Sequence, residues 1–230
     1  MFPPSHIARP SRRLIRVAPP VHCCDQARRR GFTLIEMLVV VAVIALVTSA
    51  IAPMIFSTLM STQITSAGDT LSSQIALGRQ LAVSGNQEIE VRFYQYVEQA
   101  APGSVSSFRA LALVRTAGTE GAQLGQQVTD TYYLPSGVVV SNNALLSPPL
   151  QVLPTTPDKE GIIKKVPGAT YRAFHFYPDG STDLPEYKLK AKQCYITLGE
   201  ERIIADGTIP KNFYAVQVDP NTGRTVHYRP

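Results

Sequence analysis

The pattern of hydrophobic and polar positions divides the chain into one long helix followed by short strands. Residues 34–56 are almost entirely apolar, and Glu36 is the only ionisable side chain among them. At about 1.5 Å per helical residue, residues 37–55 would cover roughly 28 Å, close to the ~30 Å hydrocarbon core of a bilayer. The pattern therefore predicts a transmembrane and assembly helix over residues 32–56.

Beyond residue 56 the sequence becomes polar but keeps a helical rhythm. We expect residues 57–85 to be the amphipathic half of one helix that runs from about Thr33 to Ser84, because Ser84-Gly85-Asn86 is a typical stop. Pro53 removes one backbone hydrogen bond and predicts a kink near residues 49–53. The apolar positions recur every three or four residues and would share one face: Ile64, Ala67, Leu71, Ile75, Gly78 and Ala82.

From residue 87 onward the period falls to 2, which is typical of strands. Residues 88–97 alternate apolar and polar side chains and predict a half-buried strand. Residues 142–168 contain five prolines, which exclude a central strand there, so we expect a loop that is either disordered or an interaction surface. Further strands are predicted at 108–115, 131–134, 138–140, 171–177, 193–198 and 213–218, with a terminal hairpin over 213–229. The predicted fold class is α+β, a long N-terminal helix packed on an antiparallel β-rich head of residues 86–230.

Charge is distributed unevenly along the chain. Residues 1–31 hold seven of the 22 Lys and Arg and one of the 17 Asp and Glu, which leaves 15 basic and 16 acidic residues in the remainder. The formal charge of +5 therefore belongs to the N-terminal segment and gives little support to a nucleic-acid partner. Arg28, Arg29 and Arg30 precede the apolar run, so the positive-inside rule predicts a cytoplasmic N-terminal segment and an exported head.

No pattern of catalytic or metal-binding residues stands out. The only cysteine after residue 31 is Cys194, which we interpret as a small hydrophobe buried in a strand rather than a reactive thiol. His175 lies near Asp179 in the sequence, and we interpret it as structural. The sequence has no Gly-rich phosphate loop, no Ser-His-Asp signature and no Cys/His cluster at metal spacing. We therefore expect no enzymatic activity, no cofactor and no metal.

The segment Gly31-Phe32-Thr33-Leu34-Ile35-Glu36, preceded by cations and followed by an apolar span, resembles the processing motif of type IV prepilins and pseudopilins. The resemblance implies that residues 1–31 are a leader peptide, cut between Gly31 and Phe32, and that the new N-terminal Phe32 is N-methylated. Glu36 then becomes the fifth residue of the mature chain, and Pro53 matches another habitual feature of the family. The alternative is an ordinary signal anchor with an incidental glutamate.

The resemblance also implies partners and a location. They are a prepilin peptidase that is also the N-methyltransferase, other pilin-like subunits, an inner-membrane assembly platform and membrane lipid. The expected location is a single pass in the inner membrane, with a cytoplasmic leader and a periplasmic head, followed by a filament. In the filament, Glu36 would pair with the free amine of a neighbouring Phe32, which offsets the desolvation of both charges. The filament is a surface pilus or a short periplasmic pseudopilus, and the large head favours a minor subunit.

The head resembles the H-type minor pseudopilins of type II secretion, in which a strand-Pro-Asp-Gly segment and a terminal Gly-Arg hairpin recur. More narrowly, the chain resembles the pilin-like Verru_Chthon cassette protein D family through residues 88–94, 176–181 and 219–224. An alternative function is a minor pilin that binds DNA for uptake, since related proteins use a basic Gly-Arg tail. Arg224, His227 and Arg229 partly match that tail, although a hairpin with a solvated Arg face is the simpler interpretation.

Overall fold

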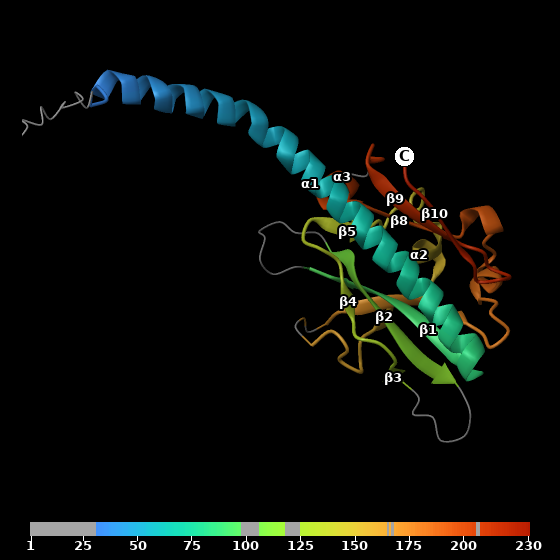
Figure 1. Ribbon diagram of the computed structural model, residues 1–230. Coiled ribbons are helices and arrows are strands. Elements are labelled where there is room, and N and C mark those ends of the chain that lie inside the picture. The colour runs from blue at the N-terminus through green and yellow to red at the C-terminus, as the bar shows by residue number, and fades with distance from the viewer. Residues whose placement is uncertain (1–30, 98–105, 118–124, 165, 167, 206–207) are drawn as a thin grey trace, which may run out of the picture. The chain divides into compact units, whose positions relative to one another are not determined.

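A computed structural model describes residues 31–97, 106–117, 125–164, 166, 168–205 and 208–230, without the side chains of residues 50–56, 117 and 205 (Figure 1). The predicted leader therefore lies outside the described residues except for Gly31. The chain divides into two compact units, Met1–Ser49 and Ala50–Pro230, and each is described here by itself.

Helix α1 is assigned from Leu34 to Gly85 and confirms the predicted helix to within one residue at each end. The assignment runs through Pro53, and the kink there stays a prediction. The predicted span includes residues 50–56, whose side chains the structure does not describe. In the part of the chain that the structure describes, no helix is both long enough and apolar enough to cross a membrane.

The head is built on one sheet in which all pairs of strands are antiparallel. The order of strands is β10-β9-β8-β5-β2-β1-β7-β6, and β3 and β4 also pair with β2. The bounds are β1 Glu88–Tyr96, β2 Ser107–Ala117, β3 Gln126–Gln127, β4 Tyr132–Tyr133, β5 Val138–Val140, β6 Thr156–Pro157, β7 Thr170–Phe176, β8 Tyr195–Glu200, β9 Phe213–Val218 and β10 Thr225–Tyr228. The observed α+β architecture confirms the predicted fold class.

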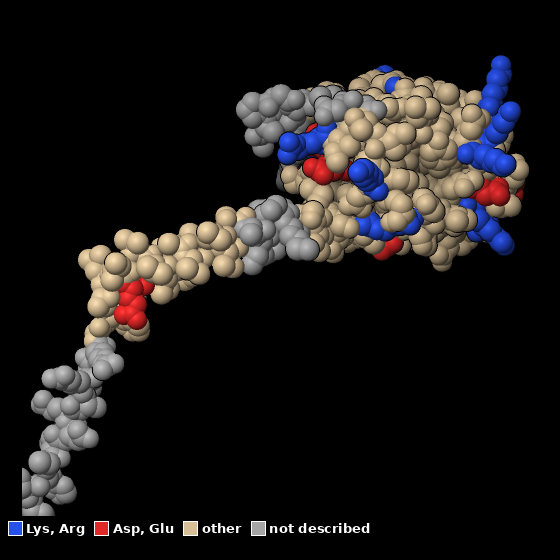
Figure 2. Space-filling model, turned by 90° about the horizontal axis from the view of Figure 1, so that it is seen from above, with Lys and Arg blue, Asp and Glu red and all other residues tan. Residues whose placement is uncertain are grey.

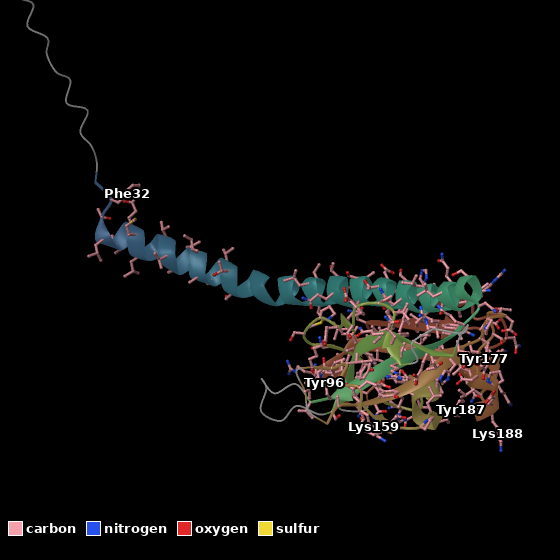
Figure 3. All side chains as sticks on the ribbon, turned by 90° about the horizontal axis from the view of Figure 1, so that it is seen from below. Phe32, Tyr96, Lys159, Tyr177, Tyr187 and Lys188 are labelled. Carbon is pink, nitrogen blue, oxygen red and sulfur yellow. The ribbon has the colours of Figure 1, made fainter. Side chains whose placement is uncertain are left out.

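One face of the sheet packs against the second half of α1, as the side view in Figure 3 shows. The predicted helical stripe from Ile64 to Ala82 is fully buried there. It meets the inward residues of the central strands, such as Val91, Phe93 and Phe174. Burial of apolar surface stabilises a fold by about 25 cal/mol per Å², so this contact contributes to the stability of the head.

The opposite face of the sheet is also covered, which the sequence did not predict. The expectation that the strand at 88–97 is half-buried is wrong, because its residues from Ile89 to Tyr94 are buried on both faces. Ile163, from the Pro-rich segment, and Ala169, which directly follows it, join Tyr94 and Tyr171 in a second apolar cluster. Polar side chains of β1 therefore lie beneath a folded segment rather than in solvent.

The expectation of an unstructured loop at 142–168 also needs correction. This segment contains helix α2, Pro148–Val152, and the two-residue strand β6, which pairs with β7 at the edge of the sheet. Pro148 and Pro149 occupy the first positions of α2, where the missing N–H has no intrahelical partner to lose. The prediction that prolines exclude a central strand holds. The remaining short elements are α3, Glu201–Ala205, and two 3-10 helices, Leu184–Tyr187 and Ala191–Gln193.

Candidate functional site

The predicted cleavage junction lies in exposed, non-helical backbone immediately before α1. Gly31 and Phe32 are both exposed, and the helix begins only at Leu34. A side chain added at Gly31 would meet no other atom of the described chain within 4 Å. A peptidase could therefore reach the bond between Gly31 and Phe32 without unfolding any element, and glycine is not required at this position by the fold.

Thr33 and Glu36 form the N-terminal cap of α1. The Thr33 Oγ1 atom accepts a hydrogen bond from the backbone N–H of Glu36 at 3.3 Å, and Met37 N–H donates to the Thr33 carbonyl at 3.2 Å. A hydroxyl at the cap followed three residues later by glutamate is the capping-box pattern, and an anion in the first turn complements the helix dipole. The Glu36 carboxylate is exposed and forms no ion pair with any of the residues that the structure describes.

The first half of α1 presents apolar side chains all around its surface. The exposed large hydrophobic residues from Leu34 to Val47 are between 46% and 84% accessible. Two hydroxyl groups of this half are bonded to the backbone of the same helix. Thr48 Oγ1 donates to the Ile44 carbonyl at 2.9 Å, and Ser49 Oγ donates to the Leu46 carbonyl at 2.8 Å. A contiguous apolar surface of this kind indicates a contact with lipid or protein.

The second half of α1 depends on a close approach to strand β9. A Cβ atom at Gly68 would overlap the ring of Tyr214, so only glycine leaves room for that buried ring. The Tyr214 hydroxyl donates to the Asp69 carboxylate at 2.7 Å and fixes the ring against the helix. Sequence reasoning missed Gly68, although an isolated glycine inside a helical pattern is a signal of close packing.

Two turns of the head meet at Arg79, near the C-terminal end of α1. The Arg79 Nε atom donates to the Thr222 carbonyl at 2.6 Å, and the same side chain lies against Gly180 and Gly223. Both glycines have positive φ, +84° and +63°, which other residues rarely adopt. The Pro-Asp-Gly and Asp-Pro-Asn-Thr-Gly motifs are therefore structural turns that close the head onto α1.

The three cations of the predicted nucleic-acid contact do not form one free surface. Arg229 donates through Nη2 to the Ser61 carbonyl, the Ser61 hydroxyl and Asn212 Oδ1, at 3.0, 2.7 and 3.1 Å. His227 stacks on Tyr214, with ring centroids 5.7 Å apart. Arg224 is exposed on the turn into β10. The DNA contact stays a prediction. Of its two arginines, only Arg224 has a guanidinium that forms no hydrogen bond with the residues that the structure describes.

A buried ion pair lies between the sheet and the Pro-rich segment. The Arg92 guanidinium donates through Nε to Glu90 at 2.7 Å and also pairs with Glu160, which comes from that segment. It lies over the ring of Tyr171, 4.4 Å from the centroid. Because Glu90 is buried beside Arg92, its charge could not remain there without that cation.

His175 contacts Asp183 rather than Asp179, its neighbour in the sequence. Its ring Nδ1 lies 2.7 Å from Asp183 Oδ2 and its backbone N–H donates to Asp183 Oδ1 at 2.9 Å, whereas Asp179 accepts from Ser181 within its own turn. Burial lowers the pKa of His175, but the hydrogen bond and charge of Asp183 outweigh it, so the pKa is raised. Asp183 directly precedes the 3-10 helix Leu184–Tyr187, so this contact joins that helix to β7. The contact agrees with the structural interpretation of His175.

Cys194 is buried, as predicted, although it ends a 3-10 helix just before β8 rather than lying within a strand. Burial raises the pKa of its thiol to about 11, so the thiolate is scarce at neutral pH. Within the described residues, no group of three or more His, Cys, Asp and Glu side chains is arranged to hold a metal ion.

Comparison with known proteins places the recognisable signal at the N-terminus. Residues 26–52 match the model of the prokaryotic N-terminal methylation motif. Among curated proteins, none matches the chain. Two crystal structures of the type IV minor pilin FimU from Pseudomonas aeruginosa strain PAO1 are similar in structure, in space groups P21 and P65. Their TM-scores are 0.39 and 0.36 at 11% and 12% identity, with 74% and 73% of this chain and 93% and 97% of the other covered.

Similarity at these scores supports no conclusion about function, and the matched motif carries the assignment. The cassette protein D family named above stays a prediction. The motif at residues 26–52 supports the resemblance to type IV pilin-like proteins that the sequence indicated.

Proposed function

We propose that the chain is a minor pilin or pseudopilin subunit, which is cut by a prepilin peptidase, N-methylated at Phe32 and assembled through α1 into a type IV pilus or a type II secretion-like filament. The observation that carries the proposal is the junction itself. An exposed Gly31-Phe32 bond directly precedes a capped helix with one acid in its first turn.

The surface of the first half of α1 supports assembly through this helix. Its apolar side chains are exposed and its hydroxyls are bonded to the helix backbone, so its surface offers few polar groups to water. In an apolar environment Glu36 needs a cation, and the free amine that cleavage creates at Phe32 of another subunit would provide one. A subunit docked out of register would leave both charges unpaired, so the pair would also select the register.

The proposed location is the inner membrane, with the leader in the cytoplasm and the head in the periplasm before assembly. Three arginines at positions 28–30, just before the apolar residues 34–56, support this orientation. The proposed partners are the prepilin peptidase and N-methyltransferase, other pilin-like subunits, the assembly platform and membrane lipid. The large folded head supports a minor subunit.

The test is an intact-mass and N-terminal sequence measurement on the protein isolated from membranes. The proposal expects a chain that begins with N-methylated Phe32. Gly31→Leu should leave the precursor uncut, and because a side chain at Gly31 meets nothing in the described chain, the loss would reflect peptidase recognition rather than misfolding. A native protein that keeps its Arg-rich leader, or that begins at a residue other than Phe32, would contradict the proposal.

A further inference from the structure

The head has a surface hollow that assembly through α1 does not use. Its volume is about 350 Å³, and it lies where β9, the following turn and β10 meet. Its lining combines a guanidinium, a carboxylate, an amide and a hydroxyl with one apolar side chain. These are Arg224, Asp219, Gln217, Thr222 and Val226.

Arg224 is the free donor in this hollow. Its backbone N–H lies 3.5 Å from Thr222 Oγ1, but its guanidinium makes no hydrogen bond or salt bridge that is recorded among the described residues. A guanidinium offers a planar fork of donors that matches a carboxylate with two parallel hydrogen bonds. The exposed Arg224 side chain is therefore available to an external anion.

Asp219 and Gln217 are held in place by other contacts and serve as fixed acceptors. Asp219 Oδ1 accepts the backbone N–H groups of Asn221 and Thr222 at 2.9 and 3.0 Å. These bonds lower the pKa of Asp219, so it is ionised at neutral pH. Gln217 Nε2 donates to the Ala191 carbonyl at 3.1 Å, which leaves its own carbonyl oxygen as an acceptor.

Two lysines flank the residue of the 3-10 helix Ala191–Gln193 that Gln217 contacts. The bond from Gln217 to Ala191 places this helix next to the hollow, and Ala191 lies between Lys190 and Lys192. Both lysines and the nearby Lys188 are exposed, and none has a recorded ion pair within the described residues. Figure 2 shows Lys and Arg side chains gathered at one end of the head, and Figure 3 shows Lys188 pointing away from the sheet.

We propose that this hollow binds an acidic saccharide, with a uronate carboxylate on Arg224 and sugar hydroxyls on Asp219, Gln217 and Thr222. Val226 would contact the C–H face of the ring, and the lysines would attract the anionic chain at long range. The inference does not depend on assembly, because every residue that it uses belongs to the head.

The lining favours a sugar acid over nucleic acid. An ionised Asp219 accepts hydrogen bonds from sugar hydroxyl groups, which the phosphodiester groups of a nucleic acid do not offer. The five lining residues include no aromatic side chain on which a base could stack, and stacking supplies much of the affinity for single strands. A ligand that carries both a carboxylate and several hydroxyls satisfies every polar group of the hollow.

The experiment is a calorimetric titration of the full-length protein in detergent with trigalacturonate. Its methyl ester is the matched neutral ligand, and a 12-nucleotide single-stranded DNA is the competing anion. Arg224→Gln should weaken trigalacturonate binding by at least about tenfold. Arg224→Lys should lose most of the affinity that Arg224 provides, because lysine lacks the planar pair of donors of a guanidinium. Lys190→Gln with Lys192→Gln should cost about two- to threefold. Lys159→Gln, an exposed cation on another part of the head, should change nothing.

Saturable binding with this ranking, and weaker binding of the ester, would support the proposal. It would be overturned by the absence of saturable binding, by equal binding of the ester, or by a Lys159→Gln loss equal to that of Arg224→Gln. Tighter binding of DNA that Arg224→Gln abolishes would also overturn it and would favour a nucleic-acid surface. Uncut Gly31→Leu protein should bind the saccharide like the parent, which separates this result from the outcome of the processing test.

Discussion

Between Leu34 and Val47 the large apolar side chains of α1 are exposed, whereas between Ile64 and Ala82 a narrow stripe of small and branched side chains is buried against the sheet. Both halves belong to one assigned helix, so backbone geometry does not separate them. The second half is amphipathic and finds its partner within its own chain. The first half is apolar on all sides, which is typical of a surface that contacts lipid or protein.

The difference also explains where glycine and charge are needed. In the second half, Gly68 makes room for Tyr214 and polar residues face water. In the first half the one charge, Glu36, has no recorded partner in the described chain. Mutations in the second half should therefore change the stability of the head, and mutations in the first half should change assembly.

The largest expected effect is on assembly, with Glu36→Gln. This change keeps the size of the side chain but removes the charge that would pair with a neighbouring Phe32 amine, so assembled subunit should fall at least about tenfold. Processing and the unfolding of the head should not change. Filament fractionation, with intact mass as the readout of cleavage, measures both.

The matched control for this change is Thr33→Ala, which removes the cap hydrogen bond to the Glu36 N–H but keeps the carboxylate. Its cost to the helix should be about 1 kcal/mol, and assembly should persist. An assembly defect in Thr33→Ala as severe as that of Glu36→Gln would mean that the cap, rather than the charge, is the essential feature.

The second largest effect is expected on the face of the sheet opposite α1. There, Arg92→Ala would leave Glu90 buried without its cation. Breaking a buried pair of this kind should reduce the free energy of unfolding by about 3–5 kcal/mol. Near-UV circular dichroism of the tyrosines during urea unfolding is a suitable probe, since the chain has ten Tyr and no Trp. Lys159→Ala, at an exposed neighbour of Glu160, should stay within about 0.5 kcal/mol of the parent.

Gly68→Ala and Gly78→Ala make the same chemical change at two points of the same helix. At Gly68 the new methyl group would overlap the Tyr214 ring, and overpacking should cost about 1–3 kcal/mol of unfolding free energy. At Gly78 the nearest atom, Leu113 Cδ2, would be 3.2 Å away, and the gain in helix propensity of about 1 kcal/mol should offset the crowding. Equal urea midpoints for the two variants would contradict the close approach at Tyr214.

The smallest effect is the pH dependence that His175 contributes. Its pKa is raised above the ordinary 6.5, mainly through Asp183, with smaller contributions from Glu90 and Glu88. Its contribution is therefore complete below about pH 6.5 and is lost as the pH rises through the folded-state pKa. Because the ring is partly exposed, we expect about 0.5–1 kcal/mol.

The measurement compares urea unfolding of the parent and His175→Gln at pH values of about 5.5 and 8.5, on either side of the ordinary histidine pKa. The parent should lose more stability than the variant between the two conditions. A parent that gains stability over this interval relative to His175→Gln would show that the Asp183 contact does not favour the protonated ring.

The spacing of apolar residues alone was enough to predict the helix and most of the longer strands. The stripe from Ile64 to Ala82 was predicted correctly, because a period of 3.6 follows from helix geometry and needs no knowledge of the partner. Most of the longer strands were predicted for the same reason. The processing motif was also visible, since it depends on residue types and spacing within six consecutive positions.

What the sequence by itself determined about this protein is therefore its local content: a helix with an apolar and an amphipathic half, a set of strands, their turns and the N-terminal motif. Only the tertiary structure decided which residues from distant segments meet. It brought Asp183 to His175, placed the Pro-rich segment over Arg92 and joined Arg229 to Ser61. The physical reason is that such contacts depend on the pairing of strands far apart in the chain, and no local spacing encodes that pairing.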